Sequence, residues 1–206
     1  MKRLFVLFVW VIASVSAKAE TPVILVLGDS ISAGYGLAHV EQGWVALLQT
    51  RLKEQEYGYQ VVNASVSGET TAGGLARLPR ALTLHQPKIV ILELGGNDGL
   101  RALPIAQMRA NLVRMVELAS AAGAKVLLLG MRMPPNYGPD FTEQFRMSFS
   151  DLARDNKLPL VPFLLNDIAL FPNLMQADGI HPNELGQPKL LDNVWPSLKP
   201  LLLRPR

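Results

Sequence analysis

The chain has 206 residues, of which 49% are hydrophobic and 18% are charged, so it is long enough for one full-sized domain with a substantial core. It contains no cysteine, which excludes disulfides, a thiolate nucleophile and cysteine-ligated metal sites. Its 20 Lys and Arg residues against 17 Asp and Glu residues give a net charge of only +3, and no basic run suggests a nucleic-acid partner.

The first residues have the features of a secretory signal peptide. A basic start at residues 1–3 precedes an apolar run at residues 4–15, and Ala17 and Ala19 are the small residues that a signal peptidase reads. The run is too short for a membrane anchor, which needs about 20 apolar residues. We expect cleavage of residues 1–19 after Ala19, and a periplasmic or secreted single domain over residues 20–206 without a stable membrane anchor. Cleavage would remove three basic residues and leave 17 charges of each sign.

Apolar segments that predict strands alternate with helical patterns along the rest of the chain. The first strand, at 23–27, is a continuous apolar run, which is typical of a strand covered on both faces of a parallel sheet. Further strands are expected at 60–64, 88–94, 125–129 and 158–161. Helices are expected from about 44 to 52 and at 71–84, 104–122, 141–156 and 184–203, the last being broken or short because it contains prolines. This alternation predicts an α/β fold with a mostly parallel five-stranded sheet.

Ligands of such folds bind at the carboxyl ends of the strands, so the loops that follow the strands are the candidate sites. The first strand ends in G-D-S at residues 28–30, where Ser30 is either a presented hydroxyl or an ordinary helix-capping serine. The second leads into a turn that contains Gly68. The third ends in G-G-N-D at residues 95–98, where Asn97 can offer an N–H group to a developing oxyanion, unless the segment is only a glycine turn.

A carboxylate and a histidine stand close together near the C-terminus. Asp178 precedes His181 by three residues, so its carboxylate can turn back onto the imidazole and orient it. The other two histidines, His39 and His85, have no such partner at a fixed short spacing, although Glu41 lies near His39. His181 is therefore the best candidate for a general base, the alternative being a solvated histidine in a surface loop.

Taken together in chain order, these motifs resemble the four conserved blocks of the SGNH (GDSL) hydrolases. The segments LGDSISAGYGL, ELGGNDGLR, MRMPPNYG and DGIHPNELGQ are similar to the bacterial periplasmic thioesterase I, lysophospholipase and arylesterase subgroup, from which Ile31 and Gly186 depart. The resemblance implies a three-layer, flavodoxin-like α/β/α fold. It also implies a serine esterase or thioesterase that hydrolyses small-molecule acyl esters or thioesters without a cofactor.

The resemblance also implies roles for individual residues. Ser30 would be the nucleophile, His181 the general base and then acid, and Asp178 the residue that orients His181. The N–H groups of Ser30 and Gly68 and the side chain of Asn97 would form an oxyanion hole.

The loop at 131–139 follows the fourth strand at the same sheet edge, and its methionines and prolines suit a wall for an acyl chain. The expected substrate-binding residues are Asp98, Leu100, Met133, Pro134 and Tyr137.

Two other functions compete with this reading. A metal-dependent hydrolase could gather Asp29, Asn97 and His181, but one well-placed histidine is few for a catalytic zinc site, and we expect no metal. A non-catalytic periplasmic binding module would not need a serine, a D-x-x-H pair and an oxyanion asparagine together. Nucleotide binding is disfavoured because no Walker A or G-x-G-x-x-G motif follows a strand.

Overall fold

The computed structural model describes residues 21–202, so the expected signal peptide at 1–19 and its cleavage site lie outside the described residues. The centre of the fold is a five-stranded sheet in the order β2-β1-β3-β4-β5, and each pair of neighbouring strands is parallel. The strands are β1 (Val23–Gly28), β2 (Gln60–Asn63), β3 (Ile89–Glu93), β4 (Lys125–Leu129) and β5 (Leu160–Val161). The predicted α/β fold with a parallel five-stranded sheet is confirmed.

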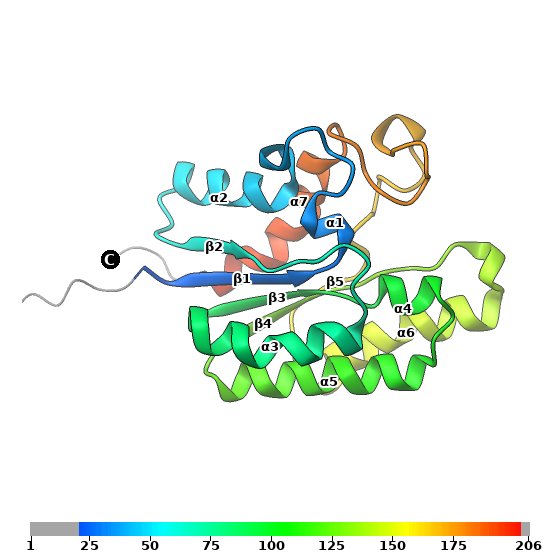
Figure 1. Cartoon of the computed structure of the whole chain (residues 1–206), viewed down its shortest axis with the longest axis horizontal. Helices are drawn as coiled ribbons and strands as arrows, with labels where there is room; N and C mark the ends of the chain where they lie inside the picture. Colours follow the sequence, from blue (N-terminus) through cyan, green and yellow to red (C-terminus); the bar gives the residue numbers. More distant parts are fainter. Residues whose placement is uncertain (1–20, 203–206) are drawn as a thin grey trace, which may run out of the picture.

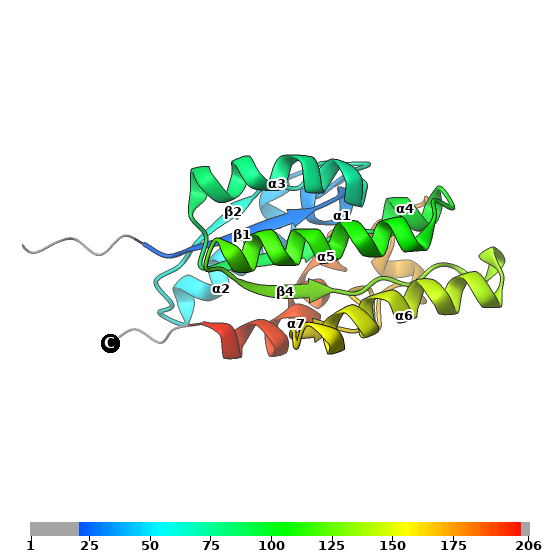
Figure 2. The same ribbon diagram turned by 90° about the horizontal axis from the view of Figure 1, so that it is seen from below.

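Helices cover both faces of this sheet. The long helices are α2 (Trp44–Glu54), α3 (Thr71–His85), α5 (Ile105–Ala121), α6 (Pro139–Asp155) and α7 (Gln187–Leu198). Helices α2 and α7 pack together on one face, whereas α3, α5 and α6 lie on the other (Figures 1 and 2). This is the three-layer α/β/α arrangement. None of the helices within residues 21–202 combines the length and apolar character needed to cross a membrane.

The helix boundaries differ from the predicted ones mainly around prolines and short turns. The C-terminal helix starts at Gln187, with Pro188 in its first turn, where a missing N–H group does no harm, and it contains Pro196. Two short helices that the sequence pattern did not predict, α1 (Ser30–Ala33) and α4 (Gly96–Leu100), follow β1 and β3 directly. Segments of four or five residues are too short to show helical periodicity. Single 3₁₀ turns lie at Val40–Gln42, Pro135–Tyr137, Pro172–Leu174 and Lys199–Leu201.

The core forms where the two central strands are covered on both sides. Residues 24–27 of β1 and 89–92 of β3 are fully buried, which explains their continuous apolar sequences. Trp44 and Leu48 of α2 pack onto this core, as do Leu78 of α3 and Leu112 of α5. The buried sheet thus gives the loops at its carboxyl edge a rigid base.

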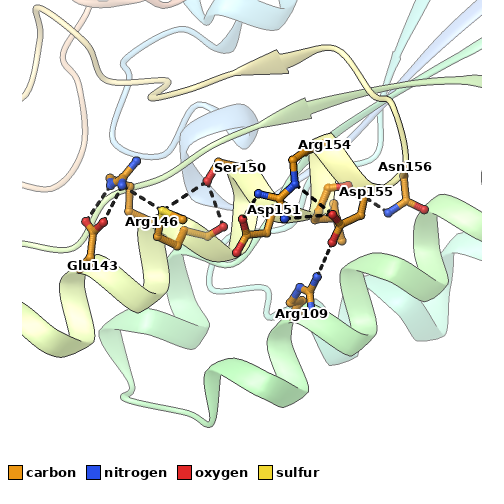
Figure 3. Close-up of polar contacts among 10 residues, drawn as sticks. Arg109, Glu143, Arg146, Ser150, Asp151, Arg154, Asp155 and Asn156 are labelled. Carbon is orange, nitrogen blue, oxygen red and sulfur yellow. Dashed lines mark hydrogen bonds and ion pairs between the residues drawn. The ribbon is translucent and has the colours of Figure 1, made fainter.

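The outer face of α6 carries a row of ion pairs and hydrogen bonds between polar side chains (Figure 3). Arg146 pairs with Glu143 at 2.6 Å, Arg154 pairs with Asp151 at 2.8 Å, and Arg109 of α5 reaches Asp155 at 2.9 Å. Exposed ion pairs of this kind contribute about 0–1 kcal/mol each. We interpret this face as a solvent-exposed helix surface and not as a binding site.

The strand order places the candidate site. From β1 the chain crosses through α2 to β2 at one side, and then through α3, on the opposite face, to β3 at the other side. The carboxyl ends of β1 and β3 therefore form the switch point at which open α/β sheets bind ligands. The G-D-S and G-G-N-D motifs lie directly at this point.

Candidate active site

Ser30 stands at the junction between β1 and the short helix α1. It is the first residue of α1, so its N–H group has no acceptor within the helix. The preceding residue, Asp29, caps the helix by accepting a hydrogen bond from the Ile31 N–H at 3.1 Å. The strand and the cap together fix the direction in which the hydroxyl of Ser30 points.

The loop before α7 brings Asp178 and His181 to this hydroxyl. The Nε2 atom of His181 lies 2.8 Å from the Oγ atom of Ser30, and its Nδ1 atom lies 2.6 Å from Oδ2 of Asp178. The other carboxylate oxygen of Asp178 accepts the N–H groups of Ile180 at 2.9 Å and His181 at 3.0 Å. Gly179 permits this tight turn through its positive φ of 66°.

The hydrogen bonds of this turn keep Asp178 ionised. Slight burial raises the pKa of Asp178, but the N–H and ring of His181, the N–H of Ile180 and the charge of His181 outweigh it and lower the pKa to about 2. An ionised carboxylate on Nδ1 directs the other ring nitrogen to accept a proton from the serine. Carboxylate, imidazole and hydroxyl in this order can activate a serine for attack on a carbonyl carbon.

One contact to the His181 ring and two to its neighbours support the position of His181. The ring of Tyr35 lies 4.7 Å from the His181 ring, centroid to centroid. The side-chain amide of Gln176 donates to the carbonyl oxygens of Tyr35 at 2.8 Å and Pro182 at 3.1 Å. Gln176 thus links the segment after Ser30 to the segment that carries His181.

Gly68 and Asn97 reach the same cavity as Ser30 and His181. Gly68 adopts φ = 78°, and a Cβ atom there would meet only the Arg101 guanidinium at 3.7 Å. Backbone conformation, and not lack of space, therefore makes glycine the suitable residue at this position. The Arg101 side chain donates to the Gly68 carbonyl at 2.9 Å and holds the turn from outside.

Asn97 is held by the residue before the serine. Its Nδ2 atom donates to Oδ2 of Asp29 at 3.1 Å, which leaves its second N–H free to point elsewhere. Burial raises the pKa of Asp29 to about 6, against the lowering influence of the Ile31 N–H, the charge of His181 and the side chains of Asn97 and Glu93. Above that pH the ionised Asp29 accepts from both Ile31 and Asn97, so it couples the serine turn to the asparagine.

The cavity has a volume of about 380 Å³, and most of its wall is apolar. Among the expected substrate-binding residues, Leu100, Met133 and Pro134 line it. The cavity is also lined by Ile31, Tyr35, Met131, Arg132, Leu165 and Ile180, none of which was among the predicted substrate-binding residues. Met131 and Tyr35 stood within noted segments, whereas Leu165 follows β5 in a loop that no sequence motif marks.

Asp98 and Tyr137 do not line the cavity, contrary to expectation. Asp98 is buried and turns back beneath the loop, where it accepts the Thr71 N–H at 2.8 Å and the Thr71 hydroxyl at 2.6 Å. A carboxylate is favoured there because it lies at the N-terminus of α3. The Tyr137 ring stacks on Phe141, and its hydroxyl donates to the Leu100 carbonyl at 3.0 Å. Both residues support the wall from behind.

The residues proposed for a metal site do not form a ligand cluster. Asp29 and Asn97 contact each other, while His181 is engaged by Ser30 and Asp178. Within residues 21–202, no group of three or more His, Cys, Asp or Glu residues is arranged to hold a metal ion.

Comparison with known proteins finds similarity over almost the whole chain. The model of the GDSL-like Lipase/Acylhydrolase family matches residues 26–188. The chain is 55% identical to the esterase TesA of Pseudomonas aeruginosa, over 93% of this chain and 94% of that protein. It is 42% identical to thioesterase 1/protease 1/lysophospholipase L1 of Escherichia coli K12, over 95% and 91%. A crystal structure of the psychrotrophic esterase EstA from Pseudoalteromonas sp., inhibited by monoethylphosphonate, superposes with a TM-score of 0.82 and 42% identity, covering 86% and 97%.

Proposed function

Because the chain belongs to the GDSL-like lipase/acylhydrolase family and is a serine ester hydrolase, we propose that Ser30, His181 and Asp178 carry out its chemistry. The family match confirms the resemblance to the SGNH hydrolases. The observation that supports the residue assignment is the unbroken contact from Asp178 through His181 to Ser30, at 2.6 Å and 2.8 Å.

The proposed reaction proceeds through an acyl-enzyme. The Oγ atom of Ser30 bonds to the acyl carbon while His181 Nε2 takes the hydroxyl proton. The intermediate then breaks its bond to the alcohol or thiol, which leaves with the proton from His181. Water attacks the acyl-enzyme in the same way, with His181 as the base, and releases the carboxylic acid and Ser30. Asp178 orients the ring and stabilises its protonated form.

The negative charge of each tetrahedral intermediate would be met by an oxyanion hole. We assign to it the N–H groups of Ser30 and Gly68 and the amide of Asn97. In support, all three residues border the cavity that contains the serine hydroxyl. These donors are held in advance by α1, by the turn that Arg101 braces and by Asp29. Donors that are already oriented stabilise charge without reorganising during the reaction.

The apolar cavity suits the acyl part of an ester or thioester. Met131 and Met133 of the loop after β4 line the cavity together with Ser30 and with Leu100, the last residue of α4. Methionine side chains adapt to the irregular shape of a flexible chain. The relatives named for esterase, thioesterase and lysophospholipase activities share acyl transfer as their chemistry, and we propose the same substrate class here.

A panel of p-nitrophenyl esters from acetyl to dodecanoyl tests this substrate class. We expect kcat/KM to rise from the acetyl ester to medium-length esters, because each buried CH₂ group adds up to about 0.8 kcal/mol. The rise should stop where the chain outgrows the cavity. Equal rates for acetyl and octanoyl esters would rule out an acyl-binding cavity, although the assignment of Ser30 would stand.

A methionine pair provides the control for this panel. Met133→Ala removes part of the apolar cavity wall, so kcat/KM should depend less on the length of the acyl chain. Turnover of the acetyl ester should stay close to that of the wild type. Met147 is a half-buried methionine of α6 that does not border the cavity. Met147→Ala should therefore leave the chain-length profile unchanged.

We further propose that residues 1–19 are a signal peptide and that the enzyme acts in the periplasm or outside the cell. The basic start, short apolar run and Ala17-Lys18-Ala19 sequence support this. We expect N-terminal sequencing of the protein from a periplasmic extract to begin at Glu20. Recovery of the intact N-terminus in the membrane fraction would contradict the proposal.

A further inference from the structure

Glu93 is a fully buried acid directly behind the nucleophile turn. It is the last residue of β3, and the register of the sheet pairs it with Gly28, two residues before Ser30. Its Oε2 atom accepts the Asp29 N–H at 3.1 Å and the Ser32 hydroxyl at 2.6 Å. Its Oε1 atom has no hydrogen-bonding partner among the described residues. The mechanism described above gives this side chain no role.

The two contacts of Glu93 lie on either side of Ser30. Asp29 precedes the serine and Ser32 follows it by two residues. A single carboxyl oxygen of Glu93 therefore accepts hydrogen bonds from both sides of the turn. Asp29 in turn holds Ile31 and Asn97. The hydrogen bonds that Glu93 accepts therefore fix the residues on either side of Ser30, and Asp29 connects them to Asn97.

Gly28 provides the space for this arrangement. A Cβ atom at Gly28 would lie 2.5 Å from Oε2 of Glu93 and 2.8 Å from the Ser32 hydroxyl. Its φ is not in the left-handed region, so conformation does not require glycine here. The glycine of the G-D-S motif is needed because the Glu93 carboxyl passes over it.

Burying an ionised carboxylate costs free energy unless hydrogen bonds or an opposite charge compensate for the lost solvation. Burial, followed by the nearby charge of Asp29, raises the pKa of Glu93 well above its usual value. Two carboxyls this close do not both ionise readily. We assign the proton to Glu93, which leaves Asp29 free to ionise and to accept from Ile31 and Asn97.

We propose that Glu93 is a positioning residue for the nucleophile, which fixes the turn carrying Ser30 through the Asp29 N–H and the Ser32 hydroxyl. The inference rests on the proposed role of Ser30. Two hydrogen bonds to a residue of a rigid central strand limit the displacement of Ser30 away from His181. Small displacements of a reacting group reduce rates strongly, by about 100-fold for 1 Å.

Two variants of Glu93 separate positioning from simple support of the fold. Glu93→Leu is similar in size but offers no acceptor, and we expect kcat for a p-nitrophenyl ester to fall about 10- to 100-fold, with little change in KM. Glu93→Gln keeps an acceptor oxygen and the shape of the side chain, and it should restore kcat close to the wild-type value. Rates are expressed per active site, titrated with a serine-directed phosphonate, so unfolded protein does not contribute.

Gln49→Ala is the matched control for lost backbone support. Its side chain accepts the Val61 N–H at 2.7 Å and donates to the Tyr59 carbonyl at 3.1 Å, at the start of β2. This variant should lower Tm without changing kcat per titrated site. If Glu93→Leu behaves in the same way, or if Glu93→Gln loses as much kcat as Glu93→Leu, Glu93 does not position the nucleophile.

Ser32→Ala tests the inference even if Glu93→Leu fails to fold. It removes one of the two donors to Glu93, and we expect a smaller loss of kcat at unchanged KM, together with slower phosphonate labelling. Wild-type kcat and labelling rate in Ser32→Ala would overturn the inference for that contact. Failure of the phosphonate to label Ser30 in the wild type would instead refute the proposed function, so the two failures are distinguishable.

Discussion

Replacing Ser30 by alanine is expected to reduce ester turnover by about 10³-fold or more. The substitution removes the proposed nucleophile, and within the described residues no other hydroxyl forms a hydrogen bond with the His181 ring. Steady-state kinetics on a short p-nitrophenyl ester measure the loss. Because the cavity wall remains, KM should change much less than kcat.

Covalent labelling identifies the nucleophile independently of turnover. A serine-directed phosphonate should modify the wild type at Ser30, as mass spectrometry of the peptides would show, and should not modify Ser30→Ala. Ser150→Ala is the matched control, because its hydroxyl caps a carbonyl on α6, at the face shown in Figure 3. Near-normal activity of Ser30→Ala would end the assignment.

His181→Ala belongs to the same experiment because base and nucleophile act as one unit. We expect a loss comparable to that of Ser30→Ala, since no proton acceptor would remain on the serine hydroxyl. The double variant should be little worse than either single variant. Losses that multiply would mean that the two residues work independently, which the 2.8 Å contact between them does not favour.

Asn97→Ala is expected to lower kcat by about 10²- to 10³-fold, with a modest change in KM. The amide would meet charge that exists mainly in the transition state, so binding of the ground state is affected little. Its contact with Asp29 orients the amide before substrate arrives. Steady-state kinetics of the variant, with kcat and KM determined separately, test this assignment.

Asn156→Ala is the control for this substitution. Its amide donates to the Leu152 carbonyl at the end of α6, at the far end of the helix from the cavity loops, and the change should leave both constants unaltered. An effect of Asn97→Ala confined to KM would mean that Asn97 binds the substrate and does not stabilise the oxyanion.

The strands and the contact between Asp178 and His181 could be predicted from the sequence because each has a local signature. Continuous apolar runs at residues 23–27, 89–92 and 126–129 identified β1, β3 and β4, since strands covered on both faces carry few polar residues. The spacing between Asp178 and His181 indicated their contact because a three-residue turn is closed by its own backbone N–H groups.

Features that depend on distant parts of the chain could not be predicted in this way. Asp98 looked like a cavity residue because its neighbour Asn97 is one, but the N-terminus of α3 draws its carboxylate inward. Tyr137 was predicted to line the cavity because its loop does, but its hydroxyl donates a hydrogen bond to the Leu100 carbonyl instead. The role proposed for Glu93 depends on the pairing of β3 with β1, which no single segment reveals.

The distance in sequence between Ser30 and His181, 151 residues, has a consequence for the time at which activity appears. A chain emerging from the ribosome or a translocation pore presents the serine early and its base almost last. Joining them closes a very long loop, whose entropic cost is offset by the contacts of the intervening sheet and by the packing of α7 on α2. Every partly synthesised or unfolded form therefore carries an ordinary, unreactive serine. Under the proposed assignment, esterase activity would therefore appear only after the segment that carries His181 has folded.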